Sequence, residues 1–195
     1  GRVTGFESHA GTTPMPLRRD ALSALAELTL AIEKIALAHA PNAVATIGEV
    51  NIANPSRNVI PGEIAFTLDV RSPDAAIMDA LDRDIRAALG ELAKRRRVEI
   101  TLDQIWRKPP TIFDSKLVDA VQAAATELGY SYRRITSGAG HDACNVASVI
   151  PAAMIFVPCK DGISHNELED ATQADCSAGA NVLLHAVLAV AGVAK

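Results

Sequence analysis

Two hydrophobic periodicities divide the first hundred residues into helices and strands. Between residues 18 and 40 the apolar residues recur at steps of three and four, which is the spacing of one helix face, and Pro41-Asn42 then ends the pattern. A second helical pattern, with steps of four, follows Ser72-Pro73-Asp74. The apolar faces consist of Leu22, Leu25, Leu28, Ile32 and Ile35 in the first helix and of Ile77, Leu81, Ile85 and Leu89 in the second.

Four stretches alternate apolar and polar residues with period two, as half-buried strands do. They are residues 2–8, 44–52, 63–71 and 97–106. In residues 63–71, EIAFTLDVR, the apolar side chains Ile, Phe, Leu and Val share one face, and Glu, Thr, Asp and Arg share the other. The order βαββαβ is the split ferredoxin-like pattern. We therefore predict an antiparallel four-stranded sheet with both helices on one face and a polar opposite face.

A Pro109-Pro110 pair ends this pattern, and we place a domain boundary there, between residues 1–110 and 111–195. In the second domain we predict helices at 114–128, from the SGAGHDA turn to about 149, and at 172–193, separated by strands at 130–135 and 152–158. Two strands alone do not make a stable sheet. We therefore expect this αβαβα segment to be one part of a larger α/β domain whose other strands lie outside the sequence.

The charge and the cysteine content limit the partners and the cellular compartment that we expect for this chain. With 19 basic and 23 acidic residues the chain is mildly negative, so we expect neither nucleic acid nor an anionic membrane as a partner. The dense basic run at residues 94–97 falls where a helix should end, and we interpret it as a solvated helix end. No apolar run approaches membrane-spanning length. Three cysteines, an odd number, fit a reducing cytoplasm.

The first residues, GRVTGF, contain neither Met nor the charged and apolar regions of a signal peptide. They lead directly into a strand-like stretch. We expect from this that the chain was cut from a longer protein.

Candidate chemistry is concentrated in two glycine-containing turns that follow the predicted strands of the second domain. His141 lies in SGAGHDA (137–143) and His165 in GISHNELE (162–169). Ligands gather at the carboxyl ends of strands in open α/β sheets, so we expect both histidines at one edge of the sheet. The alternatives are that His141 caps a helix start and that His165 is a loop histidine bonded to backbone.

Two nucleophilic arrangements fit the residue types near these turns. Ser137, His141 and Asp142 have the types of a triad, although so close a spacing does not orient the acid against the base. The second arrangement is a cysteine nucleophile paired with a histidine, for which no local sequence signature is present. Its candidates are Cys144, Cys159 and His165.

A metal site is the third chemistry, and it needs three or more His, Asp, Glu or Cys ligands. Only His165 is well placed, with Glu169 as a distant second. His39 and His185 lie on predicted helix faces, and we interpret them as structural.

Four long motifs, taken together, resemble a known family. They are HAGTTPMPLRRDAL (9–22), NVIPGEIAFTLDVR (58–71), SGAGHDA (137–143) and FVPCKDGISHNELE (156–169). They look like the metal-dependent amidohydrolases of the M20 peptidase superfamily. Within it they are most similar to the carbamoylase branch of N-carbamoyl-L-amino-acid hydrolases, allantoate amidohydrolases, ureidoglycolate hydrolases and β-ureidopropionase. The resemblance covers nearly the whole chain, in the family's order.

The resemblance implies a two-metal α/β catalytic domain that is interrupted by a smaller lid, or dimerisation, domain. Residues 1–110 would be the lid, and residues 111–195 the returning C-terminal part of the catalytic domain. It also implies a homodimer formed through the lid, in which lid residues complete the neighbouring subunit's site.

The resemblance also implies roles for individual residues. His165 would be the last ligand of a centre that holds two divalent ions, Zn or Mn, with Co or Ni as alternatives. Asn58 and Arg71 would bind the carboxylate of a small ureido or carbamoyl acid, and His9 and His141 would contact the group that is cleaved. Structural readings stay open: Asn58 shaping the Pro61-Gly62 turn, and Arg71 pairing with Asp69 or Asp74.

The chain departs from the family pattern in one large respect. The family's His-x-Asp motif and its adjacent Glu-Glu pair, which supplies the catalytic base and a ligand, occur nowhere in the sequence. We therefore expect this chain to supply one metal ligand and to be inactive alone. The alternative is a non-catalytic dimerisation or binding module derived from the same family.

Overall fold

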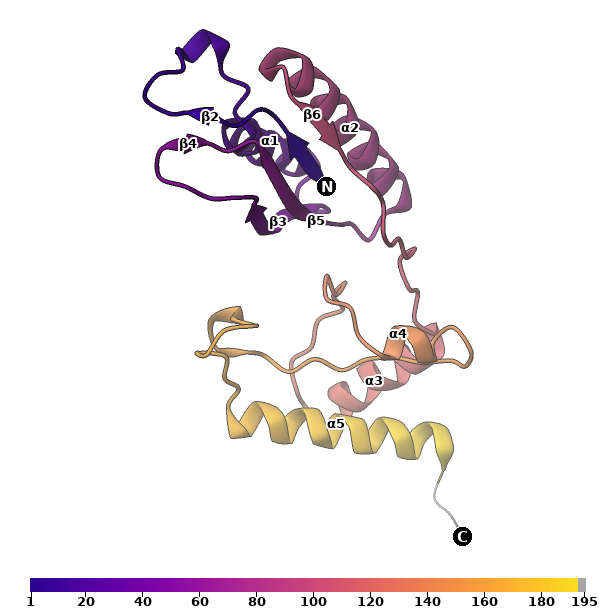
Figure 1. The fold of residues 1–195 in the computed structure, drawn as a ribbon. Helices are drawn as coiled ribbons and strands as arrows, with labels where there is room; N and C mark the ends of the chain where they lie inside the picture. The colour runs from indigo at the N-terminus through magenta and orange to yellow at the C-terminus, as the bar shows by residue number, and fades with distance from the viewer. Residues whose placement is uncertain (193–195) are drawn as a thin grey trace. The chain divides into compact units, whose positions relative to one another are not determined.

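Residues 1–192 are described in the computed structural model, in which the chain forms two units that meet between Pro110 and Thr111 (Figure 1). We call them unit 1 (Gly1–Pro110) and unit 2 (from Thr111). The elements of unit 1 are β1 (Arg2–Thr4), β2 (Ser8–His9), η1 (Met15–Leu17), α1 (Ala21–Ala38), β3 (Val44–Ile52), β4 (Val59–Ile60), β5 (Glu63–Arg71), α2 (Ala75–Arg96) and β6 (Glu99–Thr101). Those of unit 2 are α3 (Ser115–Glu127), α4 (Ala143–Val146), η2 (Lys160–Gly162) and α5 (Gln173–Ala191).

The main sheet of unit 1 has the strand order β3-β5-β1-β6, and every neighbouring pair is antiparallel. Both α1 and α2 pack against this sheet and against each other. This is the predicted βαββαβ arrangement, with two short strands added. The buried core between the helices and the sheet comprises Val3, Ala21, Ala24, Leu25, Leu28, Ile32, Ile64, Phe66, Ile85, Leu89, Leu92 and Val98.

The alternation of residues 63–71 positions β5 as predicted. Ile64 and Phe66 are buried in the core, whereas Thr67, Asp69 and Arg71 are exposed on the opposite face. Because successive strand side chains point to opposite faces, one register satisfies both sides of the sheet.

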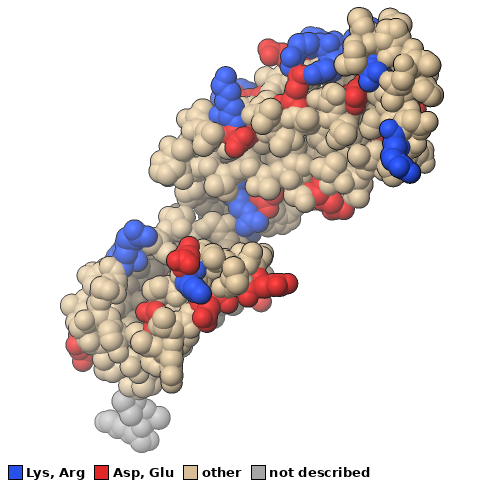
Figure 2. Space-filling model, turned by 90° about the vertical axis from the view of Figure 1, so that its left-hand side faces the viewer, with Lys and Arg blue, Asp and Glu red and all other residues tan. Residues whose placement is uncertain are grey.

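The two helices of unit 1 begin at aspartate caps and α2 ends in a basic turn. Asp20 accepts hydrogen bonds from Leu22 N and Ser23 N at 2.9 and 3.1 Å, which satisfies N–H groups that the helix leaves unpaired. At the end of α2, Arg95 and Arg96 pair with Glu27 of α1. On the face shown in Figure 2, basic side chains gather at one end of unit 1 with acidic ones among them. The run at 94–97 is therefore a helix end that is tied to α1.

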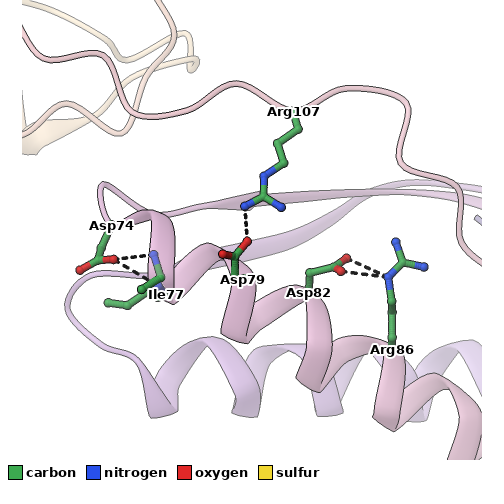
Figure 3. A network of polar contacts seen from close by, with 7 residues as sticks. Asp74, Ile77, Asp79, Asp82, Arg86 and Arg107 are labelled. Carbon is green, nitrogen blue, oxygen red and sulfur yellow. Dashed lines mark hydrogen bonds and ion pairs between the residues drawn. The ribbon is translucent and has the colours of Figure 1, made fainter.

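The last strand of unit 1 is shorter than predicted, covering Glu99–Thr101 instead of residues 97–106. Its partner β1 is only three residues long, so the ladder cannot extend further. The chain beyond it lies along α2 instead: Arg86 Nη1 donates to the carbonyl of Leu102 at 3.3 Å, and Arg107 pairs with Asp79 (Figure 3). Trp106, in this segment, has 74% of its surface exposed.

The first predicted strand, residues 2–8, is interrupted at Gly5. Its N–H donates to the carbonyl of Gly62 at 2.7 Å, and a Cβ atom at this position would lie 1.9 Å from the carbonyl oxygen of Arg19. Only glycine permits so close an approach. After the interruption, β2 pairs with β4 in a separate two-stranded ladder.

Unit 2 corrects the sequence prediction most strongly. No paired strand occurs in its described residues, so the predictions of strands at 130–135 and 152–158 are wrong. Both stretches lack a neighbouring strand with which to form a ladder. Helix α4 is also shorter than predicted and ends at Val146.

The two long helices of unit 2 follow the prediction. Helix α3 ends at Glu127, and Gly129, with a φ of 73°, closes its C-terminal cap: Gly129 N bonds Thr126 O, and Tyr130 N bonds Ala125 O. Thr172 caps the start of α5, and residue 193 of the predicted range lies outside the described residues. The two helices meet at a small buried cluster of Ala124, Ala125, Val182 and Ala186.

Helix α5 corrects the expectation that no apolar run approaches membrane-spanning length. It has 19 residues, and an 18-residue window of it has a mean hydropathy of 1.4 with 11% of the window buried. By length and composition alone it is able to cross a membrane, because Asp175 is the one Asp, Glu, Lys or Arg among its residues. A helix that other parts of a larger domain cover has the same two properties.

Candidate functional site

The β2–β4 ladder brings His9 and Asn58 together. His9 is paired with Val59 in the ladder, and the next residue, Ala10, donates its N–H to the carbonyl of Asn58 at 2.8 Å. Two residues that are 49 positions apart thus lie on adjacent backbones at one end of unit 1.

The hydrogen bonds of His9 define its tautomer. Its Nδ1 accepts from Gly11 N at 2.9 Å and from Thr12 N at 3.3 Å. A neutral imidazole has one acceptor and one donor nitrogen, so an accepting Nδ1 places the proton on Nε2. His9 therefore presents an N–H donor on an exposed side chain.

The amide of Asn58 is oriented by a neighbour that the sequence analysis missed. The Ser56 hydroxyl donates to Asn58 Oδ1 at 2.9 Å, which leaves Nδ2 as the donor end of the amide. The hydrogen bonds of Asn58 thus run to Ser56 and Ala10 and not to the Pro61-Gly62 turn. A hydroxyl residue two positions before the asparagine was the available signal.

Arg71 forms the structural pair that was left open, with Asp69. Its Nε and Nη2 donate to the two carboxylate oxygens at 2.8 and 2.7 Å on the exposed face of β5. The hydrogen bond from Arg71 lowers the pKa of Asp69, and the same bond raises the pKa of Arg71. The guanidinium fork of Arg71 thus already holds one carboxylate by two hydrogen bonds.

Arg71 is not brought together with His9 and Asn58. Asn58 precedes β4, whereas Arg71 ends β5, and the eight steps from Glu63 to Arg71 cover roughly 26 Å of extended strand. The His9–Asn58 pair therefore lies beyond the Glu63 end of β5, and Arg71 lies at the other end of that strand.

In unit 2, His141 lies two residues before α4, and its Nδ1 accepts from the N–H of Ala143, the first residue of that helix, at 2.9 Å. The side chain thus bonds the helix start, although the N-cap residue is Asp142, and the same bond places the His141 proton on Nε2. The Ser137 hydroxyl bonds the backbone of Ala139 at 3.1 and 3.2 Å. Neither side chain bonds Asp142, so the geometry of a nucleophilic triad is not formed.

His165 occupies a strained loop. Its φ of 57° is left-handed, as are those of Asp161 and Gly162, and its backbone N–H donates to Glu169 Oε2 at 2.8 Å. Left-handed conformations of non-glycine residues cluster at functional sites. His165, Asn166, Glu167 and Leu168 line a hollow in the surface of unit 2.

Neither a metal cluster nor a shared sheet edge joins the two histidines of unit 2. Within residues 1–192, no group of three or more His, Cys, Asp or Glu residues is placed to hold a metal ion. The Glu169 carboxylate is engaged by the backbone of His165. The expectation that His141 and His165 share a sheet edge also fails, because the described residues of unit 2 contain no sheet.

The two remaining histidines lie near carboxylates of neighbouring helices, and the cysteines form no disulfide in the described residues. His39 Nε2 lies 3.9 Å from Asp84, and His185 Nδ1 lies 3.8 Å from Glu127, each between two helices. All three cysteines are free thiols.

Comparison with known proteins gives these residues a family context. Residues 7–189 match the family described as Peptidase family M20/M25/M40. An N-carbamoyl-L-amino-acid amidohydrolase from Rhizobium meliloti is 42% identical over 99% of this chain and 46% of its own length. An allantoate amidohydrolase from Escherichia coli and a ureidoglycolate hydrolase from Arabidopsis thaliana are each 34% identical, over 93% and 92% of the chain and 44% and 38% of their own lengths.

Solved structures show the same relationship. A hydantoinase/carbamoylase family amidase from Burkholderia ambifaria superimposes with a TM-score of 0.90 and 49% identity, over 100% of this chain and 46% of its own. AtUAH, solved in complex with glyoxylate and with (S)-hydroxyglycine, gives a TM-score of 0.89 and 32% identity over 95% of this chain and 44% of its own. The chain thus spans about half the length of the relatives it matches. It belongs to the M20/M25/M40 peptidase family, in its hydantoinase/carbamoylase branch of amidohydrolases.

Proposed function

We propose that this chain is a portion of a metal-dependent amidohydrolase that cleaves the C–N bond of N-carbamoyl-amino acids or related ureido acids such as allantoate and ureidoglycolate. In this proposal unit 1 is the lid and unit 2 is the C-terminal part of the catalytic domain. The observation that carries it is the coverage: the amidohydrolases match 99% of this chain but only 46% of the first relative's length.

The substrate-binding roles follow from the donors in unit 1. Arg71 offers a guanidinium fork to the substrate carboxylate, with the Asn58 Nδ2 donor adding a further contact. His9, whose proton lies on Nε2, donates a hydrogen bond to the oxygen that gains negative charge as the C–N bond breaks. His141 carries the same tautomer and contacts the carbamoyl or ureido group.

The separation within unit 1 supports a homodimer. Because Arg71 and the His9–Asn58 pair lie at opposite ends of β5, a site that uses all three would draw donors from two copies of the lid. The edge strand β3 is suited to the contact, since it runs for nine residues with one edge unpaired in the sheet order. Exposed leucines on the adjacent helix α1, Leu22, Leu30 and Leu37, lie on one face and extend this surface.

The metal centre would use His165 from this chain. Its imidazole is a suitable donor for zinc or manganese, with cobalt or nickel as alternatives, but a single imidazole does not make a site. The chemistry that two such ions would supply is a water molecule of lowered pKa, available as the nucleophile. The other ligands would come from residues outside this chain, so the chain alone would be inactive.

A location in the cytoplasm belongs to the proposal as well. It is supported by the three cysteines, which are free and form no disulfide in the described structure.

The test is hydrolysis by the full-length protein, measured as ammonia release from an N-carbamoyl-L-amino acid, allantoate and ureidoglycolate in the presence of Zn²⁺ or Mn²⁺. We expect turnover of at least one of them and its loss on chelation. His165→Ala should abolish it, whereas His185→Ala, on a helix face of the same unit, should retain it. Metal-loaded full-length protein that cleaves none of the three, or that is unaffected by His165→Ala, would overturn the proposal.

A non-catalytic dimerisation or binding module is the alternative. The observation in its favour is that the described residues hold no cluster of three metal-ligating side chains. The same assay separates the two functions, because a module would form dimers without turnover at any metal concentration.

A further inference from the structure

The loop that contacts the His9 ring is braced by an arginine that has no assigned role. Arg18 donates from Nη2 to the carbonyl of Ala10 at 2.7 Å and from Nε to the carbonyl of Thr13 at 3.1 Å. Its side chain is partly buried. The two carbonyls flank the segment whose N–H groups bind His9 Nδ1, so one guanidinium holds both ends of that segment.

One peptide group connects Arg18 directly to His9. The carbonyl of Ala10 and the N–H of Gly11 belong to the same trans peptide, in which the two groups point in opposite directions. Arg18 binds the carbonyl at 2.7 Å on one side, and His9 Nδ1 accepts from the N–H at 2.9 Å on the other. A cation at the carbonyl polarises the peptide and strengthens its N–H as a donor.

We propose that Arg18 is a positioning residue that, through the Ala10–Gly11 peptide, keeps His9 in the Nε2–H tautomer and fixes the direction in which this N–H points. The inference depends on the proposed function only for the use of the donor, which is an oxygen of the substrate. The tautomer itself is a property of this chain without substrate. His9 then acts as a hydrogen-bond donor, and not as a base, because its accepting nitrogen is occupied by backbone.

Arg18 differs from the neighbouring basic residues in its hydrogen-bond partners. Arg19 is exposed, and its Nε donates to the carbonyl of Arg97 at 2.8 Å. Arg97 in turn donates to the carbonyls of Pro16 and Arg18. These contacts hold the start of α1 to the end of α2, and none of them involves the peptides that touch His9. Arg19 is therefore a matched control for Arg18.

A substitution at Gly11 perturbs the bond between Gly11 N and His9 Nδ1 without changing Arg18. A Cβ atom at this position would lie 3.1 Å from His9 Cε1 and 3.4 Å from Nδ1. Gly11→Ala should therefore displace the ring while leaving Arg18 and its carbonyl partners in place. This variant tests the coupling even where Arg18→Met does not fold.

The experiment is ¹H–¹⁵N correlation spectroscopy of the imidazole side chains in the 195-residue chain, at about pH 8, where an ordinary imidazole is neutral. We expect His9 in the native chain to show an unprotonated Nδ1 and a protonated Nε2. Arg18→Met and Gly11→Ala should each shift the Nδ1 resonance toward that of a tautomer mixture. Arg19→Met should leave it unchanged, and Arg18→Lys should restore part of the native signal.

A native His9 with its proton on Nδ1 would overturn the proposal, as would an unchanged His9 spectrum in folded Arg18→Met. If Arg18→Met does not fold, an unchanged spectrum in Gly11→Ala has the same meaning. These outcomes are independent of hydrolysis, because no substrate or metal is present. A failed hydrolysis assay would remove the proposed function and leave the tautomer result intact.

Discussion

Unit 1 and unit 2 differ in how far each buries its own apolar residues. Unit 1 encloses large side chains such as Leu28, Ile64, Leu81 and Ile85 at 2% exposure or less. The buried cluster of unit 2 has two pairs of small residues, Ala124 with Ala125 and Val182 with Ala186. A sheet covered by two helices makes a closed core, whereas two helices in contact bury only a narrow stripe.

The apolar residues of unit 2 are present but uncovered. Its described surface exposes large hydrophobic side chains from the chain before α3 to the end of α5. They include Ile112, Val149, Ile150, Leu183, Leu184 and Val190. Exposure of this many large apolar side chains is typical of a surface that other protein covers. Unit 1 therefore has the closed core of an independent domain, whereas unit 2 does not. In our proposal the remainder of the catalytic domain covers the exposed apolar residues of unit 2.

The largest expected effect comes from separating the two units. Residues 1–110 alone should unfold in a single cooperative thermal transition, because the core of unit 1 is complete. Residues 111–195 alone should show no cooperative transition and should bind the dye ANS, because their apolar surface is open. Circular dichroism and dye fluorescence measure both. A sharp transition without dye binding in the second fragment would break the comparison.

Core truncation should give a large effect in unit 1 and a small one in unit 2. Leu28→Ala should lower the free energy of unfolding of unit 1 by about 3 kcal/mol, because it leaves a cavity in a closed core. Leu30→Ala, on the same helix but 65% exposed, should change it by less than about 0.5 kcal/mol. Denaturant unfolding of the 195-residue chain gives these values.

Val182→Ala, in unit 2, should change the free energy of the cooperative transition of the 195-residue chain by less than about 0.5 kcal/mol, because that transition belongs to unit 1. Equal losses for Leu28→Ala and Val182→Ala would show that unit 2 packs as well as unit 1.

The comparison extends to chemistry, because our proposal gives the substrate carboxylate to donors of unit 1 and the metal to His165 of unit 2. In the full-length protein, Arg71→Lys should raise KM for a carboxylate substrate by about 10- to 100-fold, because a point charge replaces a bidentate fork. Bound metal should not change. Arg83→Lys, on the exposed side of α2, is the control. An unchanged KM would remove Arg71 from the substrate site.

Unit 2 should bind zinc only weakly in this chain. One imidazole at His165 supplies a small part of the coordination that a tight site requires. Isothermal titration should therefore show weak, non-stoichiometric Zn²⁺ binding by the 195-residue chain, and the chain should release no ammonia from carbamoyl substrates. One or two tightly bound ions per chain, lost in His165→Ala, would show that the chain builds its own metal site.

The smallest effect is a pH dependence confined to unit 1. The hydrogen bond from Arg96, with Arg95 nearby, lowers the pKa of Glu27 below its ordinary 4.5. A lowered pKa means that this stabilisation is complete above about pH 4.5 and is lost as the pH falls through the folded-state value. The Tm of unit 1 should therefore fall by about 2–5 °C more in the native chain than in Glu27→Gln between pH 6 and 3. Glu33→Gln, exposed on the same helix, should behave like the native chain.

The strands predicted from the sequence are present in unit 1 and absent from the described residues of unit 2. Residues 63–71 alternate apolar and polar side chains because one face of the strand packs on the core and the other lies on the opposite side of the sheet. Unit 1 contains both the core and the sheet, so the strand predicted from the alternation is present. Residues 152–158 are a continuous apolar run of the kind found in buried parallel strands, but the strands they would pair with are not among the residues described. Two-residue ladders such as β2–β4 carry no periodic signal.

The candidate site was predictable as residue types and not as geometry. The motifs identified His9, Asn58, Arg71, His141 and His165, and the structure neither assigns nor removes their catalytic roles. The proximity of His9 to Asn58 depends on the β2–β4 ladder, and the distance of Arg71 depends on the length of β5. The Asp69–Arg71 pair was foreseen as an alternative because i, i+2 residues share one strand face. The Arg18 contacts depend on the loop's three-dimensional path.

The segment of residues 102–108, which we call the strap, joins β6 to the Pro109-Pro110 pair and contains an intrinsic fluorophore. Trp106 is the chain's single tryptophan, and it lies in the strap, 74% exposed beside the Arg107–Asp79 pair, outside both buried clusters. Its emission should be that of a hydrated indole in the folded chain and should change little when either core melts. In the full-length homodimer that we propose, a blue shift of the Trp106 emission would report that other protein covers this segment.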